Sequence, residues 1–487
     1  MGRYLRGSLP FGRVILVFSS HIFLFGFLPL ALLLYYVTPP KWRSWTLTGV
    51  SYVFYGWWNP WFSILMAGST LLDYGCGLAI SRSGAGTPGA RMAMLVSVVA
   101  NLAVLAFFKY ALFVSESVDW LAASFGWAVG EPPEFLRTMV LPVGISFYTF
   151  QSMSYSIDLY RGHAKPARSL IDFSCYVSMF PQLVAGPIVR YGSVAEQLKS
   201  RRHSLEAFVS GLTRFNYGFA KKILLANPMG QVADLCFEAG DGALSGTLAW
   251  IGVLAYAFQI YFDFSSYSDM ALGLGRMLGF HFPENFDSPY KAKSITEFWR
   301  RWHISLSSFL RDYLYIPLGG NRRGRVRTYV NLMLVMLIGG LWHGAQWTFV
   351  IWGGVHGVCL AVERWAKGRI GFAIPGVARW TVTFGLLLLT WVFFRAESME
   401  VAVRYIGAMF GTLEAGPESG LLRAMVFQPA SMVTMGACFF IAMFLPNTGQ
   451  WLKRVTGWKV ATGQILLVVS VRVMSQQGFN PFLYFQF

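Results

Sequence analysis

Charged residues are scarce in this sequence: Asp, Glu, Lys and Arg together make up 13% of its 487 residues. An ordinary soluble protein carries about 25%. Hydrophobic residues, by contrast, reach 55%, and aromatic residues alone reach 17%. A chain with so few charges and so many aromatic side chains is not intrinsically disordered. At roughly 150 residues per domain, the length would predict about three soluble domains. The low share of charged residues and the high share of hydrophobic ones exclude soluble domains as well.

Acidic residues are the scarcer kind of charge, with 23 Asp and Glu against 40 Lys and Arg, so the formal net charge is +17. A basic balance indicates nucleic-acid binding only where a soluble fold carries a basic face. Because this composition leaves no room for such a fold, we predict no nucleic-acid partner.

Cysteine and several catalytic motifs are also rare or missing. The five cysteines form no CxxC pair and have no histidine at ligand spacing, so we interpret them as small buried hydrophobic residues and predict no metal site. The sequence contains no GxxxxGK[ST], GxSxG, HExxH or DxD motif. ATP-driven transport, serine hydrolysis, zinc proteolysis and metal-dependent sugar-nucleotide transfer therefore lose support.

Long uncharged runs are what the sequence does contain. About 20 apolar residues, each rising 1.5 Å along a helix, cross the roughly 30 Å hydrocarbon core of a bilayer. Counting two passes in the longest runs predicts roughly ten spans and therefore an all-α polytopic membrane protein. The runs without Asp, Glu, Lys or Arg are 14–37, 44–72, 138–157, 242–262, 328–362 and 424–452, and shorter ones are 92–108, 380–394 and 460–471.

The positive charge is concentrated in two segments. Residues 161–222 hold ten Lys and Arg against three Asp and Glu, and residues 291–330 hold nine against two, so each segment has a net charge of +7. Acidic connections at 115–134 and 228–247 alternate with them. Because an excess of Lys and Arg marks cytoplasmic loops, we expect both basic segments on the cytoplasmic side. Contact with lipid head groups and attraction of an anionic cytosolic substrate are both open roles for this charge.

Each basic segment contains an apolar stretch that would not cross lipid as an ordinary helix. Residues 172–190 are interrupted by two prolines and a glycine, and residues 298–318 by three arginines, a histidine and an aspartate. Broken backbone at membrane depth is tolerated only where protein buries it or a wet cavity borders it. We therefore expect re-entrant or interfacial helices around a site entered from the cytoplasm.

The uncharged run 328–362 contains two histidines, His343 and His356. Ionisable groups inside apolar spans are costly and are functional by default. On one helix, thirteen residues at about 100° per residue would place them on different faces, which disfavours a two-histidine metal site. An imidazole titrates near neutral pH and suits general-base catalysis. For either histidine, a helix-packing role remains the alternative.

Several longer blocks carry a family resemblance: SYVFYGWWNPWF, LPVGISFYTFQSMSYSIDLYRG, FPQLVAGPIVRY, FWRRWHISLSSFLRDYLYIPLGGNRRG, GGLWHGAQWTFVIWGGVHG and the ending NPFLYFQF. Together they resemble the membrane-bound O-acyltransferase (MBOAT) family, in its bacterial polysaccharide branch. The resemblance begins at about Val17, so we interpret 1–16 as an N-terminal extension and 17–487 as a single integral membrane domain. It implies an MBOAT-like helical fold around a buried tunnel.

The resemblance also implies a function. It implies transfer of an acetyl group from a cytosolic thioester, with acetyl-CoA as donor substrate and no bound cofactor, for O-acetylation of an exported polysaccharide. Alginate is the first expected acceptor, and cellulose and peptidoglycan are alternatives. The expected partners are membrane lipid, the polysaccharide and a periplasmic protein that passes the acetyl group onward, and the expected location is the bacterial inner membrane.

For individual residues, the resemblance assigns His343 as the catalytic base and His303 as a second, supporting polar residue. His303 or backbone N–H groups near the glycines are candidates to stabilise an oxyanion. Arg300, Arg301, Arg322 and Arg323 are candidates to contact the donor's phosphates, although membrane orientation alone also explains them. We expect Asp263 and Asp269 to pair with basic groups rather than act as acids.

Two other classes of protein remain open on the residues alone. A transporter with broken helices around a central site often has two related halves, and the sequence shows no such repeat. A structural subunit of a polysaccharide-export machine would not need His343 at all.

Overall fold

In the computed structural model, the described residues are 16–127, 130, 132–184, 186–240, 242–367, 369, 374–412 and 416–477. Every regular element in these ranges is a helix, which confirms the all-α prediction. The described chain divides into an amino-terminal unit, residues 16–208 and 274–282, and a carboxy-terminal unit, residues 209–273 and 283–477. The division between an extension at 1–16 and one domain at 17–487 stays a prediction, because residues 1–15 lie outside the described ranges.

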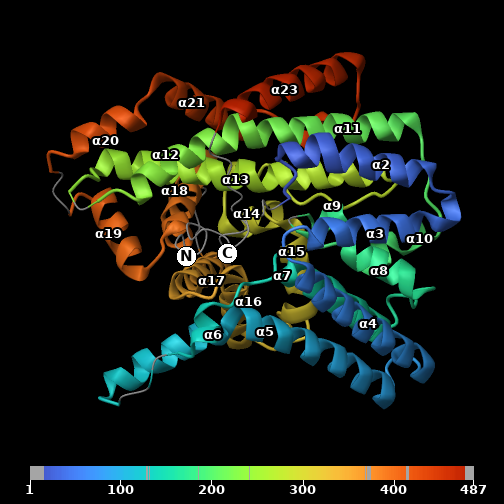
Figure 1. The fold of residues 1–487 in the computed structure, drawn as a ribbon. Coiled ribbons are helices and arrows are strands. Elements are labelled where there is room, and N and C mark those ends of the chain that lie inside the picture. Colours follow the sequence, from blue (N-terminus) through green and yellow to red (C-terminus); the bar gives the residue numbers. More distant parts are fainter. Residues whose placement is uncertain are drawn as a thin grey trace. The chain divides into compact units, whose positions relative to one another are not determined.

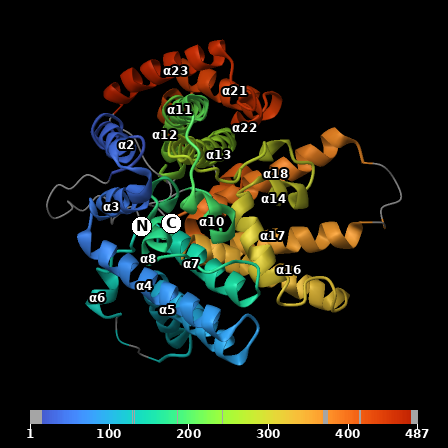
Figure 2. The ribbon, with the colours of Figure 1, turned by 90° about the vertical axis from the view of Figure 1, so that its right-hand side faces the viewer.

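The amino-terminal unit is built around three helices, α4, α5 and α7, which pack against one another. Figure 2 shows α4 and α5 running side by side. Nearly every residue of α7 is buried. The helices of this unit are η1 (Ile22–Phe27), α2 (Leu28–Val37), η2 (Pro40–Trp42), α3 (Arg43–Gly56), α4 (Pro60–Ser83), α5 (Pro88–Ser124), α6 (Glu134–Arg137), α7 (Ile145–Tyr160), α8 (Leu170–Ser178), α9 (Phe180–Leu183) and α10 (Tyr191–Lys199).

A buried polar cluster joins these three helices. Asp73 of α4 accepts hydrogen bonds from Ser97 Oγ at 2.6 Å and from Asn101 Nδ2 at 2.8 Å, both on α5. Ser97 Oγ also lies 2.8 Å from Ser156 Oγ of α7. Because a buried polar group without a partner costs free energy, these bonds fix how the three helices face one another.

The carboxy-terminal unit surrounds α13, and 78% of the most apolar 18-residue stretch of this helix is buried. Its core is aromatic: Trp391 of α18 lies 5.2 Å from Trp302 and 6.2 Å from Trp352 of α17, centroid to centroid. The helices are α11 (Leu205–Ala220), η3 (Lys221–Ala226), α12 (Asn227–Phe237), α13 (Gly246–Met277), η4 (Pro289–Lys291), α14 (Ile295–Arg301), α15 (Ile304–Leu310), η5 (Arg311–Tyr315), α16 (Arg325–His343), α17 (Trp347–Ala366), α18 (Gly376–Arg395), α19 (Met399–Met409), α20 (Ser419–Val426), α21 (Pro429–Phe444), α22 (Thr448–Trp451) and α23 (Gly457–Gln476); α11 and α13 continue past the limits of this unit.

Several helices are long and apolar enough to cross a membrane. Among the described residues these are the five helices α4, α5, α13, α18 and α23, and α20 with α21, bent by 62°, would make a sixth as one broken span. The polytopic prediction is confirmed, whereas the count of roughly ten spans is not. The difference arises because several apolar runs fold as shorter pieces. In run 44–72, for example, Asn59 caps a new helix at Pro60 by accepting from Trp61 N–H at 3.1 Å.

The two stretches expected to be broken consist of short helices. Residues 172–190 form most of α8, then α9, and residues 298–318 form the end of α14, then α15 and η5. None of these helices exceeds nine residues. A nine-residue helix is only about 14 Å long, so each is too short to span a bilayer, as the sequence predicted.

The run 328–362, which holds both histidines, folds as two helices, α16 and α17, that lie side by side (Figure 1). Glycines allow the backbones to touch: a Cβ at Gly340 would overlap the carbonyl oxygen of Phe349, and one at Gly353 would overlap that of Met336. The two histidines therefore lie on different helices, and their angle around a single helix does not apply. His343 is the last residue of α16, and His356 lies within α17.

Replacement of Gly353 by alanine should separate α16 from α17, since its methyl group would meet the Met336 backbone. We expect a loss of about 1–3 kcal/mol, the usual cost of overpacking, measured as a lower midpoint of thermal unfolding in detergent. Gly354 provides the matched control. A Cβ there would meet only Leu337 Cδ2, at 3.7 Å, so Gly354→Ala should leave the midpoint unchanged or raise it. Equal midpoints for the two variants would contradict this account of the contact.

Candidate active site

His343 lies in an aromatic enclosure at the end of α16. Its ring centroid is 5.0 Å from Trp342, 5.2 Å from Trp352 of α17 and 5.1 Å from Phe394 of α18. The residue is only 7% exposed. The next residue, Gly344, ends the helix, and a Cβ there would overlap the Phe349 ring. The enclosure excludes most water, which strengthens electrostatic interactions of the imidazole.

His303 is fully buried between α14 and α15 and has a left-handed backbone, with φ 44°. Such a conformation costs about 1–2 kcal/mol for a residue other than glycine and persists only where surrounding contacts impose it. Here Asn285 imposes it. The Asn285 carbonyl accepts from Ile304 N–H at 3.0 Å, and its side-chain Oδ1 accepts from Ser305 N–H at 3.2 Å.

The same Asn285 oxygen determines which nitrogen of His303 carries the proton. Oδ1 lies 3.2 Å from His303 Nδ1 and accepts from Ser305 Oγ at 2.8 Å. Because the Ser305 backbone N–H can only donate, the atom that it meets must be the amide oxygen. His303 Nδ1 therefore donates its proton to Asn285. In the neutral ring, Nε2 is left with a lone pair, and it has no hydrogen-bond partner in the described part of the chain.

Trp342 connects the two predicted site histidines. Its indole ring centroid is 5.9 Å from His303 and 5.0 Å from His343. The structure thus brings together His303 and His343, which are forty residues apart in the sequence. Their common neighbour is apolar over most of its surface, so the space around both imidazoles is shielded from water.

His356 occupies a different environment from the other two. It is fully buried within α17, with its Nδ1 3.3 Å from Trp299 Nε1 and its ring 4.8 Å from Trp352. Because Trp Nε1 can only donate, the Nδ1 of His356 acts as an acceptor. These contacts fit the helix-packing role that the sequence left open for this histidine.

A small polar pocket lies near His303. Asn285 lines it, and so does Phe286, whose ring is 4.9 Å from Phe264, which in turn lies 4.7 Å from His303. The pocket is therefore one residue away from the buried imidazole. Its lining residues are Arg214, Lys221, Tyr261, Ser265, Ser268, Asp269, Leu272, Glu284, Asn285, Phe286, Asn447, Thr448 and Gly449.

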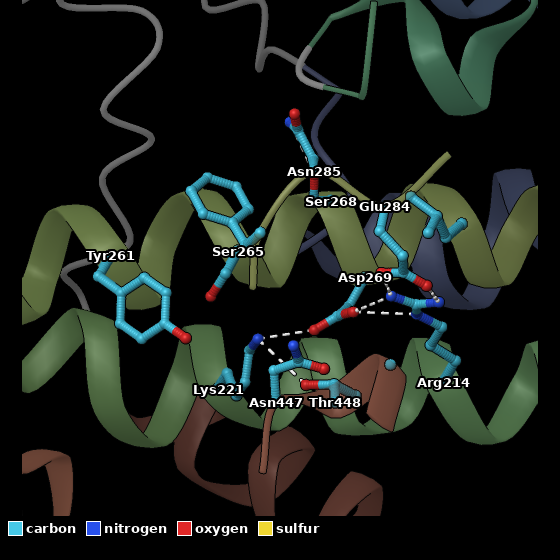
Figure 3. A pocket seen from close by; sticks show the side chains of 13 residues that line it. Arg214, Lys221, Tyr261, Ser265, Ser268, Asp269, Glu284, Asn285, Asn447 and Thr448 are labelled. Carbon is cyan, nitrogen blue, oxygen red and sulfur yellow. Dashed lines mark hydrogen bonds and ion pairs between the residues drawn. The ribbon is translucent and has the colours of Figure 1, made fainter. Parts of the chain in front are cut away.

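Charged groups in this pocket are paired with one another. Asp269 lies between Arg214 Nη2, at 2.8 Å, and Lys221 Nζ, at 2.6 Å (Figure 3). Arg214 also binds Glu284 through two hydrogen bonds of 2.6 and 2.5 Å. Asp263, deeper in α13, pairs with Lys222 at 2.5 Å. The expectation that Asp263 and Asp269 pair with basic groups is confirmed.

Sequence reasoning missed the pocket and its residues. In the sequence, Arg214 and Lys221 are two of ten basic residues in one segment, and Asn285 belongs to none of the predicted motifs. Nothing in the spacing of α11, α13 and the 283–288 loop predicts that they meet. The polar groups able to contact a substrate are the hydroxyls, amides and paired charges named above, and no described group of three or more His, Cys, Asp and Glu side chains could hold a metal ion.

The four arginines predicted to contact a donor lie outside this pocket lining. Arg301 is engaged, with Nη2 2.9 Å from Glu297 Oε1 and Nη1 donating to the Asp287 carbonyl at 3.1 Å. Arg300, Arg322 and Arg323 are exposed. Donor binding by these residues stays a prediction.

Comparison with known proteins identifies relatives along most of the chain. The model of the membrane-bound O-acyltransferase family matches residues 166–399. A probable alginate O-acetylase AlgI of Pseudomonas putida is 46% identical over 97% of this chain and 100% of the relative, and one of Azotobacter vinelandii is 44% identical over the same shares. A peptidoglycan O-acetyltransferase of Helicobacter pylori is 37% identical over 82% of this chain and 80% of the relative. The resemblance that the sequence blocks indicated is therefore confirmed, and the chain belongs to the membrane-bound O-acyltransferase family.

Proposed function

We propose that this protein is an O-acetyltransferase that uses a cytosolic thioester, acetyl-CoA, to acetylate hydroxyl groups of an exported polysaccharide. The observation that carries the proposal is the pair of buried histidines, His343 and His303, which both contact Trp342, with a polar pocket near His303. Alginate is the proposed acceptor, since the alginate O-acetylases match almost the whole chain. Peptidoglycan is the second candidate, supported by the Helicobacter pylori relative.

In the proposed reaction His343 acts as the general base. It takes the proton from an acceptor hydroxyl while that oxygen attacks the thioester carbonyl, and the carbon–sulfur bond then breaks. The proton passes from His343 to the leaving thiolate, which gives free CoA and the acetyl ester. A positioned base contributes about 10²–10⁴-fold to the rate, so orientation of the two substrates in one enclosed site must supply much of the remainder.

His303 acts in this proposal through its Nε2 lone pair. Because Nδ1 donates to Asn285, the neutral ring has no N–H at Nε2 with which to stabilise an oxyanion. The geometry favours His303 as an acceptor for a hydrogen bond from the substrate hydroxyl or the donor's amide groups. Oxyanion stabilisation then falls to backbone N–H groups of the turn after Gly344, since the Gly344 N–H itself donates to the Gly340 carbonyl at 3.3 Å.

The cellular setting is part of the same proposal. The protein lies in the bacterial inner membrane with its basic segments facing the cytoplasm, where acetyl-CoA is available. A periplasmic partner protein receives the acetyl group or the acetylated intermediate and passes it to the polysaccharide.

Replacement of His343 by asparagine should abolish acetyl transfer, because the amide cannot take a proton. The measurement is release of free CoA by purified protein given radiolabelled acetyl-CoA and oligoalginate, and formation of labelled ester when a periplasmic extract supplies the partner protein. His356→Gln, which keeps an acceptor for Trp299, should retain most of the activity. Transfer by monodisperse His343→Asn protein would refute the base assignment, and absence of thioester turnover in the unmodified protein would favour a transporter.

Asn285 should control the activity through His303. Asn285→Ala removes the acceptor for Nδ1, and we expect a loss on the order of 10–100-fold, as for other groups that orient an imidazole. Asn285→Asp keeps the acceptor and adds a negative charge that stabilises the protonated ring. The acidic limb of its pH–rate profile should therefore move to higher pH.

The control for this pair is Ser268→Ala, which removes only the partner of the Asn285 amide nitrogen, 3.2 Å away. That variant should keep the unmodified pH–rate profile. An unchanged profile in Asn285→Asp as well would show that Asn285 serves packing alone.

Reversal of charge at Arg322 and Arg323 to glutamate should raise the apparent KM for acetyl-CoA and leave kcat unchanged, if these exposed arginines attract the donor's phosphates. Reversal to glutamate at both Arg364 and Arg369, exposed arginines outside both basic segments, makes the same change in net charge and is the control. A KM equal to that of the control would assign the two arginines to membrane orientation only.

A further inference from the structure

The amino-terminal unit contains a group of two arginines and a histidine that the proposed reaction does not use. Arg43 begins α3, whereas Arg201 and His203 lie in the connection after α10. Arg43 Nη1 lies 3.2 Å from His203 Nδ1. Both guanidinium groups face the ring of Tyr35 on α2, at 5.3 Å for Arg43 and 5.9 Å for Arg201. Two positive charges therefore share one aromatic neighbour in a half-buried place.

No carboxylate in the described part of the chain compensates these charges. The partners of Arg201 are neutral: Ser44 Oγ, Tyr35 Oη and the Gln197 carbonyl, at 2.5, 3.1 and 3.2 Å. Arg43 Nε donates to the Thr38 carbonyl at 3.3 Å. Half-buried like charges repel more strongly than charges in bulk water. A bound anion would remove that cost.

His203 is held neutral by this arrangement. The Tyr35 hydroxyl donates to the Leu278 carbonyl at 2.8 Å, so its oxygen accepts from His203 Nε2–H, and His203 Nδ1 accepts from Arg43. Burial, together with the charges of Arg43 and Arg201, lowers the pKa of His203 below its ordinary value. The ring of Tyr36 also lies 5.7 Å from it. An anion beside the two arginines would reverse their effect and raise this pKa.

The surroundings indicate what kind of anion reaches the group. On α2, Leu33 and Val37 are 59% and 67% exposed, which is typical of a lipid-facing surface. Trp42 and Trp45 follow directly, both at least half exposed, with ring centroids 6.3 Å apart. Exposed tryptophans at the end of an apolar helix mark the membrane–water boundary. Lipid phosphates lie at that depth.

We propose that Arg43 and Arg201 form a binding site for the phosphate of an anionic phospholipid whose acyl chains lie along the exposed face of α2. Guanidinium groups bind phosphate through paired, charge-assisted hydrogen bonds, and Arg43 Nη2 has no hydrogen-bond partner among the described residues. His203 adds a further donor at Nδ1 once it is protonated. The site uses neither proposed catalytic histidine, so it can be tested whether or not the acetyl transfer is correct.

The first test compares two double variants with the same change in net charge. Arg43→Gln with Arg201→Gln removes the site, and Lys41→Gln with Arg202→Gln removes two exposed neighbouring cations. Binding of phosphatidylglycerol is measured by native mass spectrometry and by retention in phosphatidylcholine nanodiscs that contain a phosphatidylglycerol fraction. The site variant should bind roughly 100-fold more weakly, because it loses the charge-assisted hydrogen bonds of both guanidinium groups to the phosphate. The control loses only a longer-range attraction that salt screens, so it should bind less than about tenfold more weakly. Equal losses would overturn the proposal.

The second test is measured on the unmodified protein, and a variant serves only to assign one signal. The imidazole signal of His203, assigned by its absence in His203→Gln, is titrated in nanodiscs with and without phosphatidylglycerol. The lipid should raise the pKa of His203, and an unchanged value would overturn the proposal. In a competition arm, millimolar inorganic phosphate should not displace the lipid. Displacement, with the same rise in pKa from phosphate alone, would show a soluble phosphate site instead and would also overturn it.

Discussion

The side-chain amide of Asn285 is the interaction on which the candidate site depends. Its oxygen accepts from Ser305 N–H and from His303 Nδ1, and its nitrogen donates to Ser268 Oγ on α13. One residue therefore stabilises a left-handed backbone, selects the tautomer of a buried imidazole and forms part of the pocket wall. An amide can do all three because it has both an acceptor and a donor in one plane. A carboxylate or an aliphatic side chain at this position would provide only part of that set.

Buried charges impose a second constraint. Placing a single ion in a low-dielectric interior costs several kcal/mol, and the carboxy-terminal unit contains Arg214, Asp269, Lys222 and Asp263 within its core. Each is paired at 2.8 Å or less. Such pairs are weak evidence for stability in themselves, because the desolvation cost offsets the attraction. What they do is tie η3 and α11 to α13, on which several residues of the pocket lie.

The treatment of charge differs between the two units. In the carboxy-terminal unit, Arg214 is compensated by carboxylates from within the chain. In the amino-terminal unit, Arg43 and Arg201 contact only neutral groups, and in our proposal a bound lipid phosphate compensates their positive charge. Both sets of arginines contribute to the same net charge. We assign a structural role to Arg214, which has carboxylate partners, and a binding role to Arg43 and Arg201, which have none.

The sequence alone determined the class of protein: uncharged runs predicted membrane helices, basic segments predicted broken elements, and long blocks indicated the family. It also singled out His343, a costly histidine among apolar and glycine residues, and the family resemblance added His303. Only the tertiary structure decided how many helices each run makes, since capping at Asn59 and the backbone contacts of Gly340 and Gly353 depend on neighbours in space. It alone also decided that both histidines meet Trp342 and that Asn285 selects the tautomer of His303. Hydrogen bonds between residues far apart in the chain leave no periodic pattern in the sequence. For that reason only the tertiary structure revealed the pocket and the residues that line it.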